Sequence, residues 1–301
     1  MRIIRYKDEH SNTILAAYTE EGEIYNLPFT SLLDIVHRAE ECNCPPASLI
    51  EEIITSSFPL SEKLHDLELL TPIEAPEVWA AGVTYQKSME ARNYEATGGK
   101  LNAKTFYDKV YDAKRPEIFF KSTKERTVGP NQDVCLRSDS TWQIPEPELG
   151  LVIGNEGKII GYTIGNDMSC RDIEGENPLY LPQAKIWKQS CSIGPAVRLA
   201  ETVPNPYDLT ITCRIYRDGS CVFEGDANTG QLKRTYDELV TYLTLDNTVF
   251  EGTVLLTGTC IVPPNDFSLQ EDDQIEIEID GIGVLINIVK KVVQISDISM
   301  S

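Results

Sequence analysis

The sequence predicts a β-rich α+β protein with a small N-terminal α+β unit, residues 1–75, followed by a larger strand-rich unit, residues 76–301. Three observations support this. Short apolar runs of strand length dominate the chain after residue 117. One of them, "QIEIEID", alternates strictly, which is typical of a strand with one buried face. Helical periodicity, in contrast, is confined to a few short segments, and Pro72 and Pro76 mark a break between the two units.

The N-terminal unit combines short strands with two helices. "MRIIRYK" and "TILAAYTEEGEIYNL" read as strands joined by a Glu-Gly turn. "TSLLDIVHRAEE" places Leu32, Leu33, Ile35 and Val36 on one helical face, with Thr30 or Ser31 as the N-cap. "PASLIEEIITSS" predicts a second short helix.

The segment between residues 85 and 116 interrupts the pattern of strands. It follows the entry strand "EVWAAG", and it is long, polar and charged, with Gly98-Gly99 in its middle. An excursion of this length between strands is often an active-site lid. A plain surface insertion explains its composition equally well, so both interpretations stay open for residues 86–116.

Strands then alternate with a single clear helix. The apolar runs are "EIFFK", "LGLVIG", "KIIGYTIGN", "LTITCRIY", "TVLLTGTCIV", "DQIEIEID" and "GVLINIV". The helix is "GQLKRTYDELVTYLTL", whose apolar positions fall at helical spacing: Leu232, Tyr236, Leu239, Val240 and Leu243.

Composition limits the classes of partner and the kinds of site. The net charge of −20 repels phosphate backbones and anionic lipid, so we expect neither nucleic acid nor a membrane as partner. No apolar stretch approaches a membrane span, and the first residues do not resemble a secretion signal. The eight cysteines lack zinc spacing, and several lie in apolar strands, so we expect reduced thiols and a cytoplasmic protein. The only histidines are His10, His37 and His65, so a site built on later residues must work without imidazole unless the N-terminal segment folds over it.

Three acids stand at the ends of two predicted strands. Glu146 and Glu148, in "IPEPELG", are two apart and therefore face the same side of a strand, about 7 Å apart along it. Asp167 ends the following apolar run, "IIGYTIGND". Carboxylates from two neighbouring strand ends form the hard-oxygen type of site that Mg²⁺ prefers. The alternatives are a solvated strand end for the glutamates and a turn for the aspartate.

Two lysines and a further glutamate are candidates for acid–base chemistry or substrate binding. Lys185 lies beside Trp187 in "AKIWK", where apolar surroundings and a nearby cation would lower its pKa. Lys121 ends the strand "EIFFK" and could meet a carboxylate, and Glu117 opens that strand as a general base or as an ion-pair partner of Arg115 or Lys121. Both lysines could equally be surface side chains. The turn Thr257-Gly258-Thr259 offers hydroxyls at another strand end.

Taken together, these segments resemble the fumarylacetoacetate hydrolase superfamily over residues 76–290. The resemblance is carried, in order, by "AAGVTY", "EIFFK", "EPELGLVIG", "IIGYTIGNDMSCRD", "AKIWKQSCSIGPAV", "LLTGT" and "IEIEIDGIGVLINIV". It implies a mixed β-sandwich roll and a divalent metal, usually Mg²⁺ with Mn²⁺ or Ca²⁺ as substitutes. Carried over, the metal ligands are Glu146, Glu148 and Asp167, and the site lysine is Lys185. Thr259, with Thr84 and Lys121, is then expected to contact the substrate.

The sequence departs from the family pattern at one position, and this position distinguishes the hydrolases of the superfamily from its other enzymes. Hydrolases of the superfamily carry a histidine shortly after the entry strand to activate water, and the matching position here is Ser88. A serine without imidazole is a poor base. "WAAGVTY", "FYDKVYDAKRPEIFFK" and "PEPELGLV" look most like the branch of the superfamily that dehydrates 2-keto-3-deoxy sugar acids, of the 2-keto-3-deoxy-D-arabinonate type.

The resemblance therefore implies a lyase for a small 2-keto acid, giving 2-oxoglutarate semialdehyde. In this interpretation Mg²⁺ chelates the carboxylate and 2-keto oxygens and stabilises the enolate, and Glu117 and Lys185 are the acid–base partners. A C–C hydrolase of acylpyruvate- or fumarylpyruvate-type diketones is one alternative, and a non-catalytic keto-acid-binding relative is another. We also expect a homodimer or homotetramer.

Overall fold

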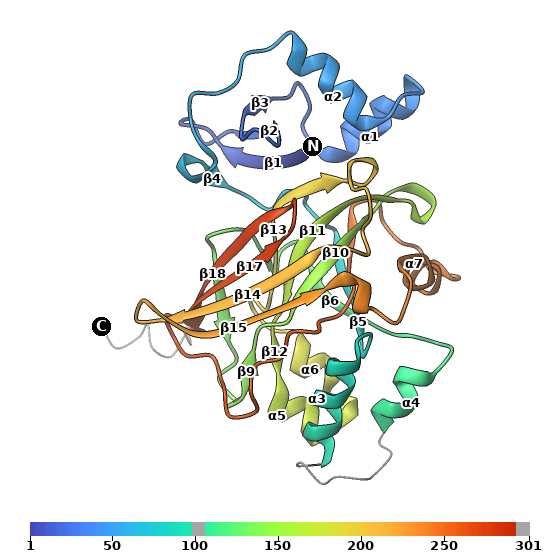
Figure 1. Cartoon of the computed structure of the whole chain (residues 1–301), viewed down its shortest axis with the longest axis vertical. Coiled ribbons are helices and arrows are strands. Elements are labelled where there is room, and N and C mark those ends of the chain that lie inside the picture. The colour runs from blue at the N-terminus through green and yellow to red at the C-terminus, as the bar shows by residue number, and fades with distance from the viewer. Residues whose placement is uncertain (98–105, 293–301) are drawn as a thin grey trace.

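The computed structural model describes residues 1–97 and 106–292, and these form two large sheets with helices at their ends (Figure 1). The larger sheet follows the order β3-β2-β1-β13-β11-β10-β16-β5-β6, with β4 beside β1 and β7 beside β13. Its strands are β1 (Arg2–Lys7), β2 (Thr13–Tyr18), β3 (Ile24–Asn26), β4 (Glu68–Leu69), β5 (Glu77–Gly82), β6 (Glu117–Thr123), β7 (Thr127–Val128), β10 (Pro147–Ile153), β11 (Ile159–Asp167), β13 (Cys191–Leu199) and β16 (Thr253–Leu256).

The second sheet has five strands in the order β15-β14-β17-β18-β8. They are β8 (Asp133–Leu136), β14 (Thr210–Arg217), β15 (Ser220–Asn228), β17 (Gln274–Ile279) and β18 (Gly283–Lys291). A small ribbon joins β9 (Gln143–Ile144) to β12 (Ser169–Cys170). Most pairs are antiparallel, but β13 with β7, β16 with β5 and β18 with β8 are parallel. The prediction of a β-rich α+β fold with mixed sheets is therefore confirmed.

Apolar side chains from the two sheets form the largest core. The predicted alternation of β17 is observed: Ile275, Ile277 and Ile279 are buried, whereas the residues between them are partly exposed. These isoleucines pack with Leu149 and Leu151 of β10 and their neighbours in one cluster. Burial of such side chains is the main source of stability for the strands that carry the site.

The N-terminal strands continue the larger sheet. β1 pairs with β13 and β2, so the chain's first strand lies beside a strand from its second half. Helices α1 (Leu32–Glu41) and α2 (Pro46–Thr55) cover these strands at the top of Figure 1. Ser31 caps α1 by accepting a hydrogen bond from the backbone N–H of Asp34. A division of the chain after residue 75 stays a prediction.

Four short helices gather at the opposite end of the molecule (Figure 1). They are α3 (Gln86–Thr97), α4 (Phe106–Asp112), α5 (Arg171–Glu176) and α6 (Leu181–Lys185). Helices α3 and α4 belong to the polar excursion of the sequence, and α3 packs against α5. Gly98-Gly99 lies outside the described residues, so the lid interpretation of residues 86–116 stays a prediction.

Two elements are shorter than the sequence predicts. Helix α7 runs from Tyr236 to Thr244, because Thr235 caps it by accepting a hydrogen bond from the backbone N–H of Glu238, and Leu232 therefore lies outside the helix. Strand β16 ends at Leu256, although the apolar run continues to Val262. The chain leaves the sheet at Gly258, whose φ of +96° is a conformation that favours glycine.

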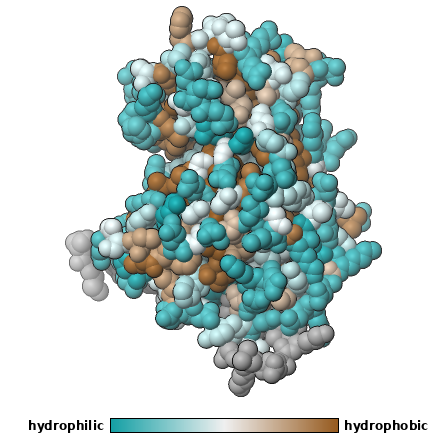
Figure 2. Space-filling view, viewed as in Figure 1, coloured by the Kyte–Doolittle hydropathy of each residue, from teal (hydrophilic) through white to brown (hydrophobic). Residues whose placement is uncertain are grey.

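The surface matches the acidic composition. Hydrophilic residues cover most of the face in Figure 2, and apolar residues appear there in smaller patches. Among the described residues, no helix is long and apolar enough to cross a membrane. All eight cysteines are free thiols, and five of them are buried.

Candidate metal centre

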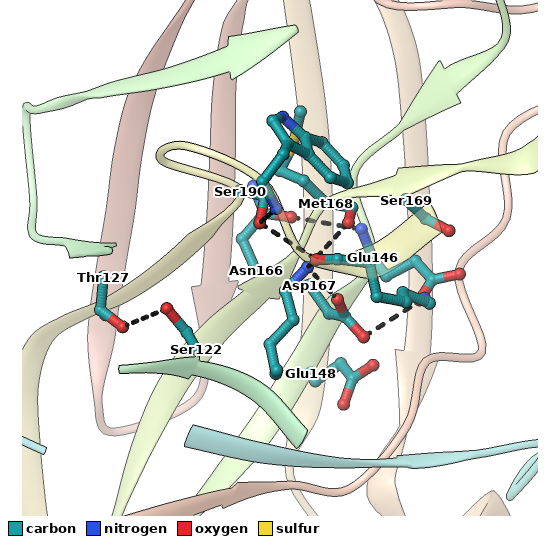
Figure 3. Close-up of polar contacts among 12 residues, drawn as sticks. Ser122, Thr127, Glu146, Glu148, Asn166, Asp167, Met168, Ser169 and Ser190 are labelled. Atoms are coloured by element: carbon teal, nitrogen blue, oxygen red, sulfur yellow. Dashed lines mark hydrogen bonds and ion pairs between the residues drawn. The ribbon is translucent and has the colours of Figure 1, made fainter. Parts of the chain in front are cut away.

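The antiparallel pairing of β10 with β11 brings the three predicted acids together. Glu148 lies opposite Gly165 in the register, and the backbone N–H of Asp167 donates to the carbonyl oxygen of Glu146 at 3.0 Å. One carboxylate oxygen from each of Glu146, Glu148 and Asp167 lies within 4.8 Å of the others. Figure 3 shows the three side chains converging from the ends of their strands. All three are buried, so the solvated-strand-end and turn alternatives do not describe them.

Burial of three like charges has an electrostatic cost that is visible at Glu148. Burial raises the pKa of this carboxyl well above its usual range, and the neighbouring charges of Asp167 and Glu146 raise it further. The backbone N–H of Gly258 donates to Oε2 of Glu148 at 2.6 Å, which acts in the opposite direction. A divalent cation would compensate these charges, and oxygen-only donors suit Mg²⁺. The residues present therefore fit a magnesium ion.

The ammonium groups of two lysines, Lys121 and Lys185, contact the acids. Nζ of Lys121 lies 2.5 Å from Oδ1 of Asp167, and it also donates to the carbonyl oxygens of Met168 (2.9 Å) and Lys185. Two of these contacts are hydrogen bonds to backbone carbonyl oxygens, and the contact with Asp167 is an ion pair. In this arrangement Lys121 holds Asp167 in place, and its role as a substrate contact stays a prediction.

Lys185, at the end of α6, lies among the carboxylates themselves. Its Nζ contacts Oε2 of Glu146 and lies 3.2 Å from Oδ2 of Asp167 and 3.3 Å from Oε1 of Glu174. Burial lowers its pKa, but the three carboxylates outweigh burial, and the net shift is upward. The expectation of a lowered pKa for Lys185 was wrong for the protein chain by itself, because the sequence did not show how many acids surround the ammonium.

Glu174 and two arginines extend this network and were not predicted. Nη1 of Arg92, on α3, lies 3.1 Å from Oε2 of Glu174, and Ser169 donates to Oε1 at 2.7 Å. Burial raises the pKa of Glu174, but Arg92, Lys185 and Arg171 outweigh burial and lower it to about 2. Nη2 of Arg171 lies 3.3 Å from Oε1 of Glu146. The clue in the sequence was "CRDIEGE", a charged stretch directly after a buried strand.

Glu117, the candidate base, opens β6 beside β5. The residue is partly buried, and among the described residues its Oε2 has no hydrogen-bond partner although solvent does not reach it. Burial raises the pKa of this carboxyl, and the positive charge of Arg92 acts against the rise. None of the ion pairs among the described residues joins Glu117 to Arg115 or Lys121. Arg115 instead stacks over the ring of Tyr242.

The two predicted threonines are both buried near the acids. Thr84, between β5 and α3, donates its hydroxyl proton to the carbonyl oxygen of Thr257 at 2.7 Å. Thr259 accepts a hydrogen bond from the backbone N–H of Ile261 at 3.2 Å. Their roles as substrate contacts stay predictions. The three histidines are exposed, and His37 pairs with Glu251, so the acid cluster contains no imidazole.

Comparison with known proteins places the chain in a family. The family described as "Fumarylacetoacetate (FAA) hydrolase C-terminal" matches residues 88–290. The chain is 48% identical to 2-dehydro-3-deoxy-D-arabinonate dehydratase of Saccharolobus solfataricus over 231 residues, 77% of either chain. It is also 48% identical to a probable 2-keto-3-deoxyxylonate dehydratase of Haloferax volcanii over 244 residues, 81% of this chain and 82% of the other.

A solved structure supports the same placement. It is a 2-keto-3-deoxy-D-arabinonate dehydratase complexed with magnesium and 2,5-dioxopentanoate. It superposes with a TM-score of 0.82 at 38% sequence identity and covers 98% of this chain and 100% of its own. The present chain belongs to the fumarylacetoacetate hydrolase family.

Proposed function

We propose that the protein is a magnesium-dependent dehydratase of a 2-keto-3-deoxy sugar acid of the 2-keto-3-deoxy-D-arabinonate type. The observation that carries the proposal is the cluster of three buried carboxylates with a lysine and a further carboxyl beside them, and no imidazole. Two relatives that are 48% identical to it over 231 and 244 aligned residues bear the names of such dehydratases. Loss of water across C3 and C4, followed by a shift of the new double bond toward C5 and tautomerisation, gives 2-oxoglutarate semialdehyde. This compound is also called 2,5-dioxopentanoate and is the one bound in the solved relative.

Glu146, Glu148 and Asp167 are the proposed ligands of the ion. When bound, the ion supplies positive charge that draws electron density from the 2-keto group and so acidifies the neighbouring C3 position. Lys121 and Arg171 hold two of the ligands, Asp167 and Glu146, in their orientation. Such support of ligating carboxylates is a general feature of metal centres.

We assign the proton transfers to Glu117 and Lys185. Because its pKa is raised, Glu117 is suited to accept the C3 proton at neutral pH. In the protein chain by itself the neighbouring carboxylates raise the pKa of Lys185 and favour its ammonium form. We assign Lys185 the donation to the departing C4 hydroxyl, which leaves as water. The proton that Glu117 gained balances the one that Lys185 lost. The elimination leaves a C3–C4 double bond and the C5 alcohol. Removal of a C5 proton by the neutral amine of Lys185 and return of the proton on Glu117 to C3 move the double bond to C4–C5 and restore both residues. The resulting C5 enol then tautomerises to the aldehyde.

Purified protein incubated with Mg²⁺ tests the proposal. We expect dehydration of a 2-keto-3-deoxypentonate, followed as formation of the semialdehyde, and no cleavage of acetylpyruvate. Cleavage of acetylpyruvate without dehydration would favour a C–C hydrolase. Inactivity toward both compounds, with no bound metal, would favour a keto-acid-binding protein without catalysis.

We further propose a cytoplasmic homo-oligomer. The free thiols support a reducing compartment, because five of the eight are buried without forming disulfides. Light scattering coupled to size exclusion measures the oligomer directly. A mass near the 33.7 kDa of one chain would contradict self-association.

A further inference from the structure

We propose that Thr84 is a positioning residue for metal binding, and that it acts through the peptide group between Thr257 and Gly258. This inference rests on the proposed metal centre and assigns Thr84 a role other than contact with the substrate. Two buried hydrogen bonds meet at that one peptide group. The hydroxyl of Thr84 donates to its carbonyl oxygen at 2.7 Å, and its N–H donates to Oε2 of Glu148 at 2.6 Å.

The two bonds strengthen each other. A hydrogen bond accepted by a carbonyl oxygen polarises the peptide and makes its N–H a stronger donor, and low surrounding polarity enhances the effect. The second bond is also charge-assisted, because its acceptor is a carboxylate when Glu148 binds a cation. Glu148 is 2% exposed and Thr84 is 1% exposed, so water does not compete for either bond. The hydroxyl of Thr84 therefore contributes to the orientation of Oε2 of Glu148 without touching it.

The peptide is held on its other side by β10. Both the backbone N–H of Thr257 (3.0 Å) and its hydroxyl (2.9 Å) donate to the carbonyl oxygen of Leu149, the residue after Glu148. Thr84 is fixed in turn, because its carbonyl oxygen accepts from the backbone N–H of Lys233 at 3.0 Å. Hydrogen bonds therefore hold this peptide on two sides, from strand β10 and from the loop that precedes α3.

The absence of a side chain at Gly258 allows this arrangement of hydrogen bonds. A Cβ at this position would lie 1.9 Å from Oγ1 of Thr84 and 2.9 Å from the carbonyl oxygen of Ala81. Only a residue without a side chain allows Thr84 to come close enough for its bond to Thr257. The positive φ of Gly258, +96°, turns the chain that follows away from the direction of β16, and this conformation favours glycine.

Titration calorimetry with Mg²⁺ on the full-length variants tests the inference. Thr84→Val keeps the shape of the side chain but removes the hydroxyl, and we expect its affinity for Mg²⁺ to fall at least tenfold, as for other residues that support metal ligands. Thr84→Ser keeps the hydroxyl, and its affinity should stay within about twofold of wild type. Thr84→Ala is a second variant without the hydroxyl and should resemble Thr84→Val.

Three outcomes would overturn the inference. Wild-type affinity for Mg²⁺ in a folded Thr84→Val or Thr84→Ala protein would show that the hydroxyl does not act on the metal site. A raised KM for the sugar acid with unchanged Mg²⁺ affinity would indicate that Thr84 contacts the substrate and does not support a metal ligand. Loss of folding in both variants, with Thr84→Ser intact, would make the hydroxyl a structural group. Failure of the wild-type protein to bind Mg²⁺ would instead contradict the proposed metal centre.

Discussion

Glu117 occupies space that a glycine leaves open on the neighbouring strand. A Cβ at Gly82 would lie 2.0 Å from Oε2 of Glu117 and 2.7 Å from its carboxyl carbon. The two residues face each other in the register of β5 and β6. The position of the candidate base therefore depends on the absence of a side chain at residue 82.

Substitution of this glycine tests the role of Glu117. Gly82→Ala should displace the carboxyl group, and because misplacement of a catalytic group by about 1 Å can cost about 100-fold, kcat should fall by a factor of that order. Mg²⁺ affinity should not change, since Gly82 does not contact the three carboxylates. Gly219→Ala is the control. A Cβ there meets nothing within 4 Å, and the φ of +77° makes the substitution strained, but Gly219 lies in the turn between β14 and β15, so kcat should not change. An unchanged kcat in Gly82→Ala would remove Glu117 from the proposed mechanism.

Ser88 separates the dehydratase from the hydrolase interpretation. It lies buried on α3, and the resemblance to the family aligns it with the histidine of the hydrolases. Dehydration requires no activated water, so Ser88→Ala should retain at least half of the wild-type kcat in the semialdehyde assay. A complete loss of activity in a folded variant would reopen the hydrolase interpretation.

At the scale of elements, an ion pair between buried side chains joins α3 to α5 beside the site. Arg92 on α3 and Glu174 on α5 have side-chain exposures of 4% and 0%. A buried charge left with no counterpart typically costs about 3–5 kcal/mol. Loss of Arg92 should cost less than this, because Lys185 still faces Glu174.

Loss of this ion pair should be visible in stability. Arg92→Met should lower the free energy of unfolding in urea by more than about 1 kcal/mol, but by less than the cost of about 3–5 kcal/mol for a buried charge with no partner left. The control is Arg38→Met, which removes an exposed ion pair with Glu41 and should cost less than about 1 kcal/mol. Equal effects of the two substitutions would show that the Arg92–Glu174 pair does not anchor α3.

Local patterns in the sequence predicted which helices and strands form. They were less reliable for where an element begins or ends and for which strands pair with each other. The alternation in β17 and the spacing in α1 depend on adjacent residues, and both predictions are confirmed. The beginning of α7 was predicted too early, because capping by Thr235 outweighs the apolar match at Leu232. The pairing of β1 with β13 joins residues almost 200 positions apart, and no local pattern encodes such a contact.

The residues of the candidate site could likewise be predicted only where a local pattern in the sequence marks them. Glu146, Glu148 and Asp167 could be named because each stands at the end of an apolar run, and the resemblance to a family supplied the rest. Arg92 lies on an excursion whose position relative to the sheet the sequence does not reveal, so its contact with Glu174 was not foreseen. The direction of the pKa shift of Lys185 was mispredicted for a similar reason, because it depends on acids from three separate segments.

At the scale of the whole molecule, metal binding should stabilise the fold. The chain carries a net charge of −20, and the proposed site concentrates part of it in a buried cluster. A ligand that binds only the folded state at 100 times its Kd adds about 2.7 kcal/mol to the free energy of unfolding. Mg²⁺ should therefore raise Tm in a calorimetric scan, and EDTA should reverse the rise.

The same scan identifies the ligands. Glu148→Gln preserves the size of the side chain but removes a ligand charge, so its Tm should no longer respond to Mg²⁺ and its activity should be lost. Glu156→Gln, on an exposed turn, should respond as the wild type does. A full Tm response in Glu148→Gln would take Glu148 out of the ligand set.

Anomalous diffraction from crystals grown with Mn²⁺ locates the ion itself and so tests the proposed metal centre. We expect one strong anomalous peak bounded by carboxylate oxygens of Glu146, Glu148 and Asp167, at coordination distances of about 2.0–2.2 Å. A peak elsewhere, or an ammonium group of Lys185 at that position in fully loaded crystals, would contradict it.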